Sequence, residues 1–304
     1  MGGIFFLKKY SRPPIREAAT HEANENALKA LRPMFGPMKL VDIDATQIEV
    51  HLRHRLQQKK HVRRRAGVAE LGTLKPATVH QEFRVLRRIL NVAVKKKLCP
   101  ANPCAGVEFP VILKGLFRPH YMTWSEQVQI EEHGPAYLRN VIRIITETGL
   151  RVYKELALMK KDQVEIANKV VFIADSKTPT GVAEVPLTDI AVEAFRSQIE
   201  LAGPGRWLFP SSKKPGEAQT DFKKTWERSL RKAGIPYFRL YDLRSTYATR
   251  LSAGGVADEW VTQLLRQTDA KVFKKYSQMK LQMKREALTK LNRKANEINL
   301  FKQF

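Results

Sequence analysis

Four residues in the second half of the chain have side chains that could act together on one phosphate group: Arg151, Lys177, Arg244 and Tyr276. Two arginines can hold the two non-bridging oxygens of a phosphodiester through forked, charge-assisted hydrogen bonds that lysine cannot duplicate. A lysine on a turn could protonate the leaving oxygen, and a phenol could attack the phosphorus and form a covalent link. The set therefore indicates phosphoryl transfer driven by positioning and electrostatic stabilisation.

Each of these residues lies in a short sequence motif. Taken singly, an arginine after a glycine or a lysine on a hairpin is more often an ordinary surface residue, so the weight lies in the joint occurrence and the order. The motifs are Thr-Gly-Leu-Arg at 148–151, Ser-Lys-Thr at 176–178, Asp-Leu-Arg-Ser-Thr-Tyr-Ala-Thr at 242–249, and a leucine pair at 264–265 ahead of Tyr276.

These motifs resemble those of the tyrosine recombinases, also called phage integrases. The resemblance covers about residues 20–295, because the N-terminal half, notably 78–103, is similar to the helical core-binding domain of that family. It implies a mainly α fold with a small β-sheet. A helical, SAM-like core-binding domain would precede a mixed α/β catalytic domain.

The resemblance also implies a function, the site-specific recombination or integration of DNA. Arg151 and Arg244 would contact the phosphate, Lys177 would be the general acid, and Tyr276 would form a 3′-phosphotyrosine intermediate. That intermediate keeps the energy of the broken bond, so we expect no ATP, no metal and no other cofactor. Strand exchange between two duplexes needs four active sites. We therefore expect a homotetramer on double-stranded DNA, assembled from monomers or weak oligomers.

The sequence departs from the family pattern at several positions. Tyr241 stands where the family has histidine, Gln267 where it has histidine or tryptophan, and Arg266 where it has glycine. Lys154 stands where an acid would orient its neighbours, with Glu155 shifted by one residue. Tyr241 and Gln267 can still donate hydrogen bonds to a phosphate oxygen, but neither can supply an imidazolium charge. We expect an active enzyme that is slowed by these replacements.

Three other functions remain as alternatives. A DNA-binding relative that has lost catalysis would keep the basic surface. A type IB topoisomerase shares the chemistry, but nothing in the sequence resembles its larger clamp. A basic RNA-binding structural protein would not explain why the motifs occur in this order along the chain. The sequence also has no aromatic-rich RNA-recognition motif.

The charge of the chain indicates a polyanionic partner. The 304 residues have a formal net charge of +24. Residues 1–116 contain 22 Lys and Arg against 9 Asp and Glu, and residues 117–304 contain 32 against 21. Because both halves are basic, they could clamp a nucleic acid and gain affinity from released counterions. A generally basic protein without such a partner is the plainer alternative.

Cysteine usage and hydropathy indicate an intracellular protein. Cys99 and Cys104 have a CxxxxC spacing with no second pair, which is weak evidence for zinc. No apolar stretch reaches the ~18 residues that a membrane span needs, and Met1 to Leu7 is short for a signal peptide. We expect reduced cysteines, no metal, no membrane, and a cytoplasmic, DNA-associated protein encoded by a bacterium or a phage.

Breaks in the pattern predict two domains. Pro13-Pro14 would break any helix in the first 20 residues, which we expect to be loosely ordered. Prolines and weak periodicity after residue 105 predict a linker. The predicted organisation is a lead-in at 1–20, a helical core-binding DNA-binding domain at 21–112, a linker at 113–118, a catalytic domain at 119–280, and a C-terminal helix at 281–304 that could be exchanged between protomers.

In the first domain, apolar spacing predicts helices over about 21–34, 44–58 and 76–97. The basic run at 59–74 and a basic stripe on the third helix are solvated in the plainest interpretation. On a chain this basic, we expect the stripe to contact DNA and treat the run as a loop that could do so. The residues assigned to DNA contact are Arg63, Arg64, Arg65, Arg84, Arg88 and Lys95.

In the second domain, Thr123 and Glu126 predict a capping box where a helix begins. Turn residues at 175–181 predict a hairpin that carries Lys177. Helices are expected at about 137–148, 152–160, 189–201, 218–233, 242–253 and 257–265, and strands at about 163–174 and 182–187.

Overall fold

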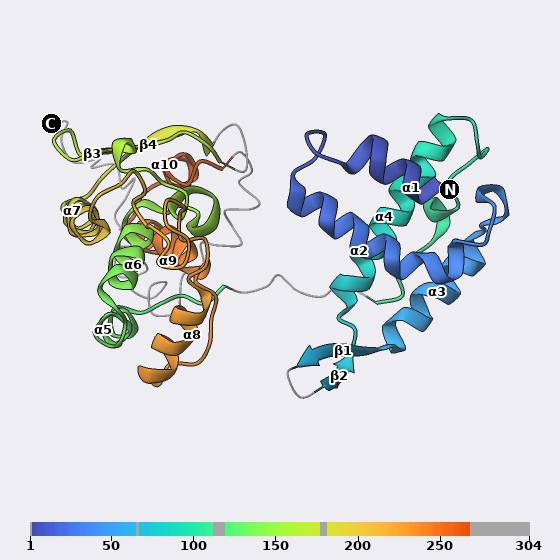
Figure 1. The fold of residues 1–304 in the computed structure, drawn as a ribbon, viewed down its shortest axis with the longest axis horizontal. Coiled ribbons are helices and arrows are strands. Elements are labelled where there is room, and N and C mark those ends of the chain that lie inside the picture. The colour runs from blue at the N-terminus through green and yellow to red at the C-terminus, as the bar shows by residue number, and fades with distance from the viewer. Residues whose placement is uncertain (1, 65–66, 112–118, 177–180, 268–304) are drawn as a thin grey trace, which may run out of the picture. The chain divides into compact units, whose positions relative to one another are not determined.

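The computed structural model describes residues 2–64, 67–111, 119–176 and 181–267 (Figure 1). The chain separates into two compact units, residues 1–115 and 116–304, and each is described by itself. The described residues of both units are mainly helical, with one small antiparallel sheet in each. The predicted fold class is therefore confirmed. The predicted linker at 113–118 and the predicted C-terminal helix at 281–304 lie outside the described residues.

A long helix, α4 (Pro76–Lys95), is the centre of the N-terminal unit. Its predicted apolar stripe, from Val79 to Leu90, is buried, and α1, α2 and α3 all pack against it. The stripe removes apolar surface from water along the whole helix, which is the main stabilising term for such a unit. The other helical elements of this unit are α1 (Gly2–Phe6), η1 (Leu7–Ser11), α2 (Ala18–Phe35), η2 (Leu40–Asp42), α3 (Ala45–Gln57) and η3 (Pro103–Gly106).

The helix start predicted from Thr123 and Glu126 is confirmed, and α3 begins with a capping box of the same kind. At the start of α3, the Asp44 carboxylate accepts from the Gln47 backbone N–H at 2.8 Å, and the Gln47 side chain accepts from the Asp44 N–H at 3.1 Å. At the start of α5 (Trp124–His133), Thr123 and Glu126 form the same reciprocal pair. Each pair satisfies two backbone donors that a helix start leaves without partners.

The expectation of a loosely ordered lead-in is wrong. Residues 2–11 form α1 and the π-helical turn η1, and Phe6 is buried in the core beside α4. The buried Ser11 hydroxyl accepts from Asn24 Nδ2 at 2.8 Å. This stretch is too short to show a period, so one buried ring and one buried hydroxyl position it instead. Pro13-Pro14 does interrupt the helical path, as expected.

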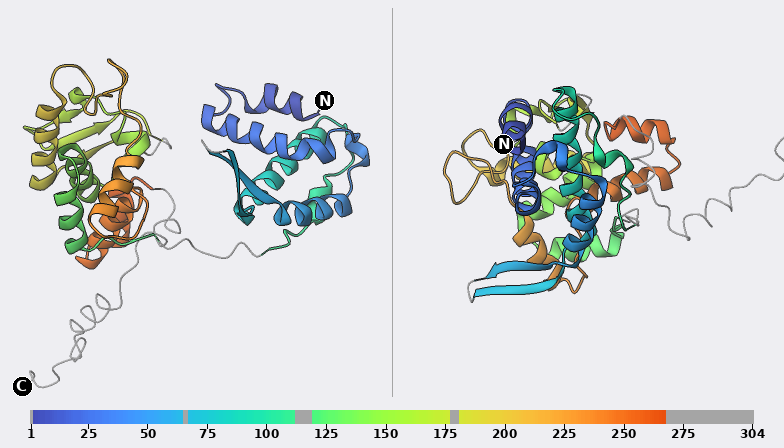
Figure 2. Two further views of the ribbon diagram at one scale, coloured as in Figure 1. Left: turned by 60° about the horizontal axis from the view of Figure 1, so that its bottom comes forward. Right: turned by 90° about the vertical axis from the view of Figure 1, so that its right-hand side faces the viewer.

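The basic run at 59–74 is a β-hairpin, whereas a loop was expected. Strand β1 (Lys59–Arg64) pairs antiparallel with β2 (Gly67–Thr73), and the hairpin projects from the helices of its unit (Figures 1 and 2). Arg63 and Arg64 lie at the tip end of β1, and Arg65 lies outside the described residues. The strands are joined by a backbone ladder, so no alternation of apolar residues was needed to form them.

The C-terminal unit surrounds α6 (Ala136–Thr148), which packs against α5, α7 and α9. Its apolar residues Val141, Ile142, Ile144 and Ile145 are buried in the main core. The antiparallel sheet has the strand order β3-β4-β5. The other elements are η4 (Val152–Leu156), η5 (Lys161–Gln163), β3 (Val164–Glu165), β4 (Val170–Ile173), β5 (Ala183–Pro186), α7 (Asp189–Ala202), α8 (Lys223–Lys232), α9 (Asp242–Ala253) and α10 (Asp258–Leu264).

Two predictions for this unit are wrong. The expected helix at 152–160 is a single π-helical turn, η4, which gives way to the sheet region. The expected strand at 163–174 is two strands, because the chain turns between β3 and β4 at Lys169, where φ is +52°. The apolar residues on both sides of that turn gave a continuous pattern that hid the break.

Candidate active site

The motif Thr-Gly-Leu-Arg forms the end of helix α6 and places Arg151 just after it. Helix α6 ends at Thr148, and Gly149 follows with a φ of +63°, a conformation that favours glycine. A Cβ atom on Gly149 would lie 2.6 Å from Cδ1 of Tyr247 on α9, so a larger residue would require the Tyr247 ring to move. Leu150 is then buried, and Arg151 lies partly buried at the edge of the core.

Arg244, on α9, is the second arginine of the site and is only 1% exposed. Its terminal nitrogens donate to the backbone oxygens of Gly149 and Leu265, so it ties the end of α6 to the segment after α10. Burial, followed by the charges of Arg151 and Arg266, lowers the pKa of Arg244 to about 10. The guanidinium therefore keeps its charge at neutral pH.

The π-helical turn after Arg151 brings Glu155 into the site. The N–H of Leu156 donates to the Arg151 oxygen at 3.1 Å, and the N–H of Ala157 to the Val152 oxygen at 2.8 Å. These bonds span five residues, so the turn contains one more residue than an α-helical turn. Glu155 is 3% exposed and accepts from the backbone N–H of Arg151 at 2.8 Å.

The interpretation that Lys154 takes the place of an orienting acid is therefore wrong. Lys154 forms an ion pair with Asp175 at 3.1 Å near the surface. Glu155, one residue later, forms an ion pair with the Arg151 side chain and accepts from the Ser176 hydroxyl at 2.6 Å. The wide turn compensates for the one-residue shift in sequence, so the carboxylate is kept.

Arg266 is a third arginine in this cluster, which the sequence analysis noted only as a replacement. It follows α10 with a φ of +53°, a left-handed conformation that costs a non-glycine residue about 1–2 kcal/mol. Its side chain is buried, with Nη2 2.9 Å from Glu155 Oε2 and Nη1 3.0 Å from the Leu264 oxygen. Burial lowers the pKa of Arg266, and the nearby Glu155 opposes that shift.

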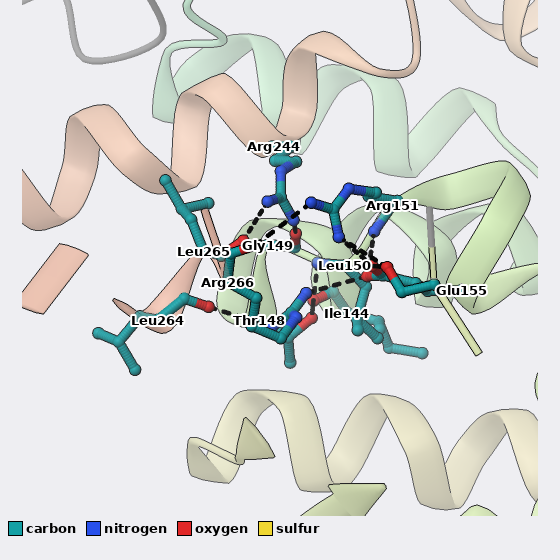
Figure 3. Close-up of polar contacts among 11 residues, drawn as sticks. Ile144, Thr148, Gly149, Leu150, Arg151, Glu155, Arg244, Leu264, Leu265 and Arg266 are labelled. Carbon is teal, nitrogen blue, oxygen red and sulfur yellow. Dashed lines mark hydrogen bonds and ion pairs between the residues drawn. The ribbon is translucent and has the colours of Figure 1, made fainter. Parts of the chain in front are cut away.

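Three guanidinium groups and one carboxylate thus meet beside Gly149 (Figure 3). Burial would raise the pKa of Glu155, but the charge of Arg266, the hydrogen bonds from Arg151 and Ser176, and the charge of Arg151 outweigh it and hold that pKa below its ordinary value. The carboxylate is therefore ionised at neutral pH and the cluster keeps a net positive charge. Such an excess would be neutralised by an anion such as a phosphate.

Tyr241 and Gln267 lie next to this cluster in the chain. Tyr241 directly precedes α9 and packs against the main core. Gln267 directly follows Arg266, and its N–H donates to the Thr262 oxygen at 3.1 Å. Its buried Oε1 has no hydrogen-bond partner among the described residues. Both side chains are amide or hydroxyl groups that can donate a hydrogen bond to an anion.

Comparison with known proteins identifies the family. Residues 122–283 match the phage integrase family. The chain belongs to this family. The integrase of Mycobacterium phage L5 is 24% identical over 244 residues, 74% of this chain and 64% of that protein. The integrase of Salmonella phage P22 is 30% identical over 131 residues, 39% of this chain and 33% of that protein. The chain spans less than two thirds of the length of both relatives.

Solved integrases share the fold. One is lambda integrase, solved as a dimer bound to a COC′ core site, with a TM-score of 0.71 and 18% identity over 91% of this chain and 76% of that one. Another is the Tn1549 transposon integrase in complex with a circular intermediate DNA, with a TM-score of 0.74 and 15% identity over 96% of this chain and 99% of that one. At these identities the comparison shows the fold alone.

Two candidate residues of this phage integrase family member, Lys177 and Tyr276, lie outside the described residues. The residues on either side of 177–180 are described, however. The Ser176 hydroxyl lies 2.9 Å from Arg151 Nη1, and a Cβ atom on Gly181 would lie 3.1 Å from the same nitrogen. Ser176 and Gly181, which flank the undescribed residues 177–180, therefore both lie beside Arg151.

The three basic residues assigned to α4 differ in their surroundings. Arg84 and Lys95 are exposed, and Arg84 has a 3.4 Å hydrogen bond to Gln81. Arg88 is partly buried, with its guanidinium carbon 5.6 Å from the centre of the Phe6 ring. Arg84 and Lys95 are therefore available to an external anion, whereas Arg88 also contributes to packing.

In the described part of the chain, no group of three or more His, Cys, Asp and Glu residues is arranged to hold a metal ion. Cys99 and Cys104 are both buried and unpaired. None of the helices among the described residues is long and apolar enough to cross a membrane.

Proposed function

We propose that the chain breaks and rejoins DNA at specific sites through a covalent 3′-phosphotyrosine intermediate. The observation that carries this proposal is the buried cluster of Arg151, Arg244 and Glu155 in a member of the phage integrase family. Fixed guanidinium groups in a largely dry site stabilise charge that develops on a phosphate, and they need no rearrangement during the reaction. Double-stranded DNA is the proposed substrate because lambda integrase and Tn1549 integrase, which share the fold, were solved bound to DNA.

In the proposed reaction, the Tyr276 oxygen attacks the phosphorus while the bond to the 5′ oxygen breaks. Lys177 gives a proton to that oxygen, the phenol proton passes to water, and the 3′ phosphate stays bonded to the tyrosine. A 5′ hydroxyl then attacks the phosphotyrosine and reverses these steps. Arg151 and Arg244 hold the non-bridging oxygens throughout. With a pKa of about 10, Arg244 stays charged at neutral pH.

Tyr241 and Gln267 are proposed as additional donors to the same phosphate. Neither carries a charge at neutral pH, so the arginines and Lys177 would supply all of the positive charge at the phosphorus. We expect slower cleavage for that reason. The proposal includes a homotetramer on DNA, with residues 281–304 exchanged between protomers. One structural neighbour, lambda integrase, was solved as a tetramer bound to a Holliday junction.

A covalent trap tests the proposed function. The protein is incubated with nicked duplexes taken from the DNA around its own gene, and the products are separated on a denaturing gel. We expect a protein–DNA adduct whose DNA-linked peptide contains Tyr276. Binding to many fragments without an adduct would favour the inactive DNA-binding relative. Relaxation of unrelated supercoiled plasmids would favour a type IB topoisomerase.

DNA contact by α4 leads to a separate prediction. Replacing the exposed Arg84 with alanine should weaken DNA binding for all sequences and reduce the slope of log K against log salt by about 1, because one phosphate contact releases about one counterion. The measurement is a salt titration of binding to a fixed duplex. An equal change for Lys39→Ala, an exposed basic residue outside the assigned set, would contradict a local contact and indicate attraction by overall charge.

A further inference from the structure

Arg266 has an unusual backbone conformation for its type. Its φ of +53° lies in the left-handed region, where glycine is favoured. The residue is nevertheless only 5% exposed. An arginine kept in this conformation needs contacts that glycine could not make, and those contacts identify what the residue does.

The side chain and the backbone of Arg266 reach the two partners of the same ion pair. Arg266 Nη2 lies 2.9 Å from Glu155 Oε2, and the Arg266 backbone oxygen lies 3.4 Å from Arg151 Nη2. The remaining terminal nitrogen, Nη1, donates to the Leu264 oxygen at 3.0 Å. Both terminal nitrogens of Arg266 are therefore bonded to the protein.

The carboxylate of Glu155 is saturated only when Arg266 is present. A carboxylate has about four lone-pair positions. Four donors are directed at Glu155: the Arg151 N–H at 2.8 Å, the Arg151 side chain, the Ser176 hydroxyl at 2.6 Å and Arg266 Nη2 at 2.9 Å. A carboxylate held at all four positions cannot rotate, and it fixes the guanidinium of Arg151 in one orientation (Figure 3).

Arg266 also changes how the charges are shared. Without it, the Glu155 charge would be matched by Arg151 alone, and the carboxylate would compete with a phosphate for that guanidinium. With it, the carboxylate is shared by two cations, as its ion pairs with Arg151 and Arg266 show. Glu155 then neutralises less of the positive charge of Arg151, so this guanidinium attracts an incoming anion more strongly.

We propose that Arg266 is a positioning residue that acts through Glu155 to orient Arg151 toward the phosphate. This inference rests on the proposed function, since the phosphate is that of the DNA substrate. The proposed role is exerted through the ion pair with Glu155. It also predicts that the effects of Arg266 and Glu155 substitutions are not independent.

The test compares Arg266→Gly, Arg266→Lys, Glu155→Gln and the Glu155→Gln/Arg266→Gly double variant. Single-turnover cleavage of nicked DNA is measured at a temperature where circular dichroism shows every variant folded. We expect Arg266→Gly to slow cleavage about 10–100-fold with the Kd for DNA changed less than about threefold. Arg266→Lys should recover about tenfold, because lysine keeps the charge and one donor. In the Glu155→Gln background, Arg266→Gly should have less than about a threefold further effect.

A second measurement does not depend on catalysis. Inorganic phosphate should raise the Tm of the wild-type protein by binding the arginine cluster, and Arg266→Gly should weaken that apparent affinity about 3–10-fold. If the wild type forms no adduct, the proposed function is wrong, and the phosphate measurement alone decides the role of Arg266. Wild-type cleavage together with a wild-type phosphate shift in Arg266→Gly would overturn the inference. So would an equal loss of cleavage in both Glu155 backgrounds.

Discussion

Replacing Tyr276 with phenylalanine is expected to abolish the covalent protein–DNA adduct completely. The substitution removes only the oxygen that would attack the phosphorus, and no other group can complete that bond. It removes no charge, so DNA affinity, which depends mainly on cations, should change less than about threefold. The measurements are adduct yield on nicked duplexes and a binding titration with the same DNA.

Tyr241→Phe is the matched control, because Tyr241 is a second phenol near the site. It would lose one hydrogen-bond donor to the phosphate but keep the nucleophile. Removing one such donor typically slows a reaction about 100–1,000-fold without abolishing the product. The assignment of Tyr276 is contradicted if Tyr276→Phe still forms the adduct and Tyr241→Phe does not.

Periodicity and capping residues predicted much of the fold. The stripe of α4 and the capping box at Thr123 are local signals, and each is present as expected. Arg151 and Arg244 could also be paired from their motifs, and in the structure both side chains donate to backbone oxygens of the segment 265–266. These signals work because a helix stripe or a helix end depends on residues within a few positions of one another.

The features that sequence analysis missed depend on contacts between distant segments. The Glu155 shift is offset by five-residue hydrogen bonds that leave no pattern of their own. Arg266 was noted as a non-glycine where the family pattern has glycine, but its partner Glu155 lies 111 positions away and could not be inferred. The hairpin at 59–74 lacks apolar alternation, so its backbone ladder could not be inferred.

Replacing Glu155 with alanine is expected to lower the free energy of unfolding by about 3–5 kcal/mol, because removal of one member of a buried ion pair leaves the other charge uncompensated. Arg266 pairs with Glu155 where both side chains are almost fully buried, and Arg151 pairs with the same carboxylate. A loss of this size is a large fraction of the total stability of a typical domain. Urea unfolding followed by circular dichroism measures it.

Lys154→Ala is the matched control for this loss, because the residue is adjacent in sequence and also ion-paired. Its bond to Asp175 joins side chains that are 35% and 72% exposed. Pairs this exposed contribute at most about 1 kcal/mol. If Lys154→Ala is as destabilising as Glu155→Ala, the π-helical turn does not place the carboxylate as described, and Lys154 has the orienting role.

The pH dependence of stability separates the charge of Glu155 from its packing. Its pKa in the folded protein is held below the ordinary value, because Arg266 and the hydrogen bonds from Arg151 and Ser176 outweigh the effect of burial. The stabilising contribution is therefore fully present above the unfolded pKa of about 4.3 and is lost as the pH falls through the lowered folded value. Glutamine does not titrate, so the stability difference between wild type and Glu155→Gln should be constant from pH 7 to about 5 and should shrink below about 4. A difference that stays constant down to pH 3 would mean that the charge of Glu155 contributes nothing, and that the arginines are held by geometry alone.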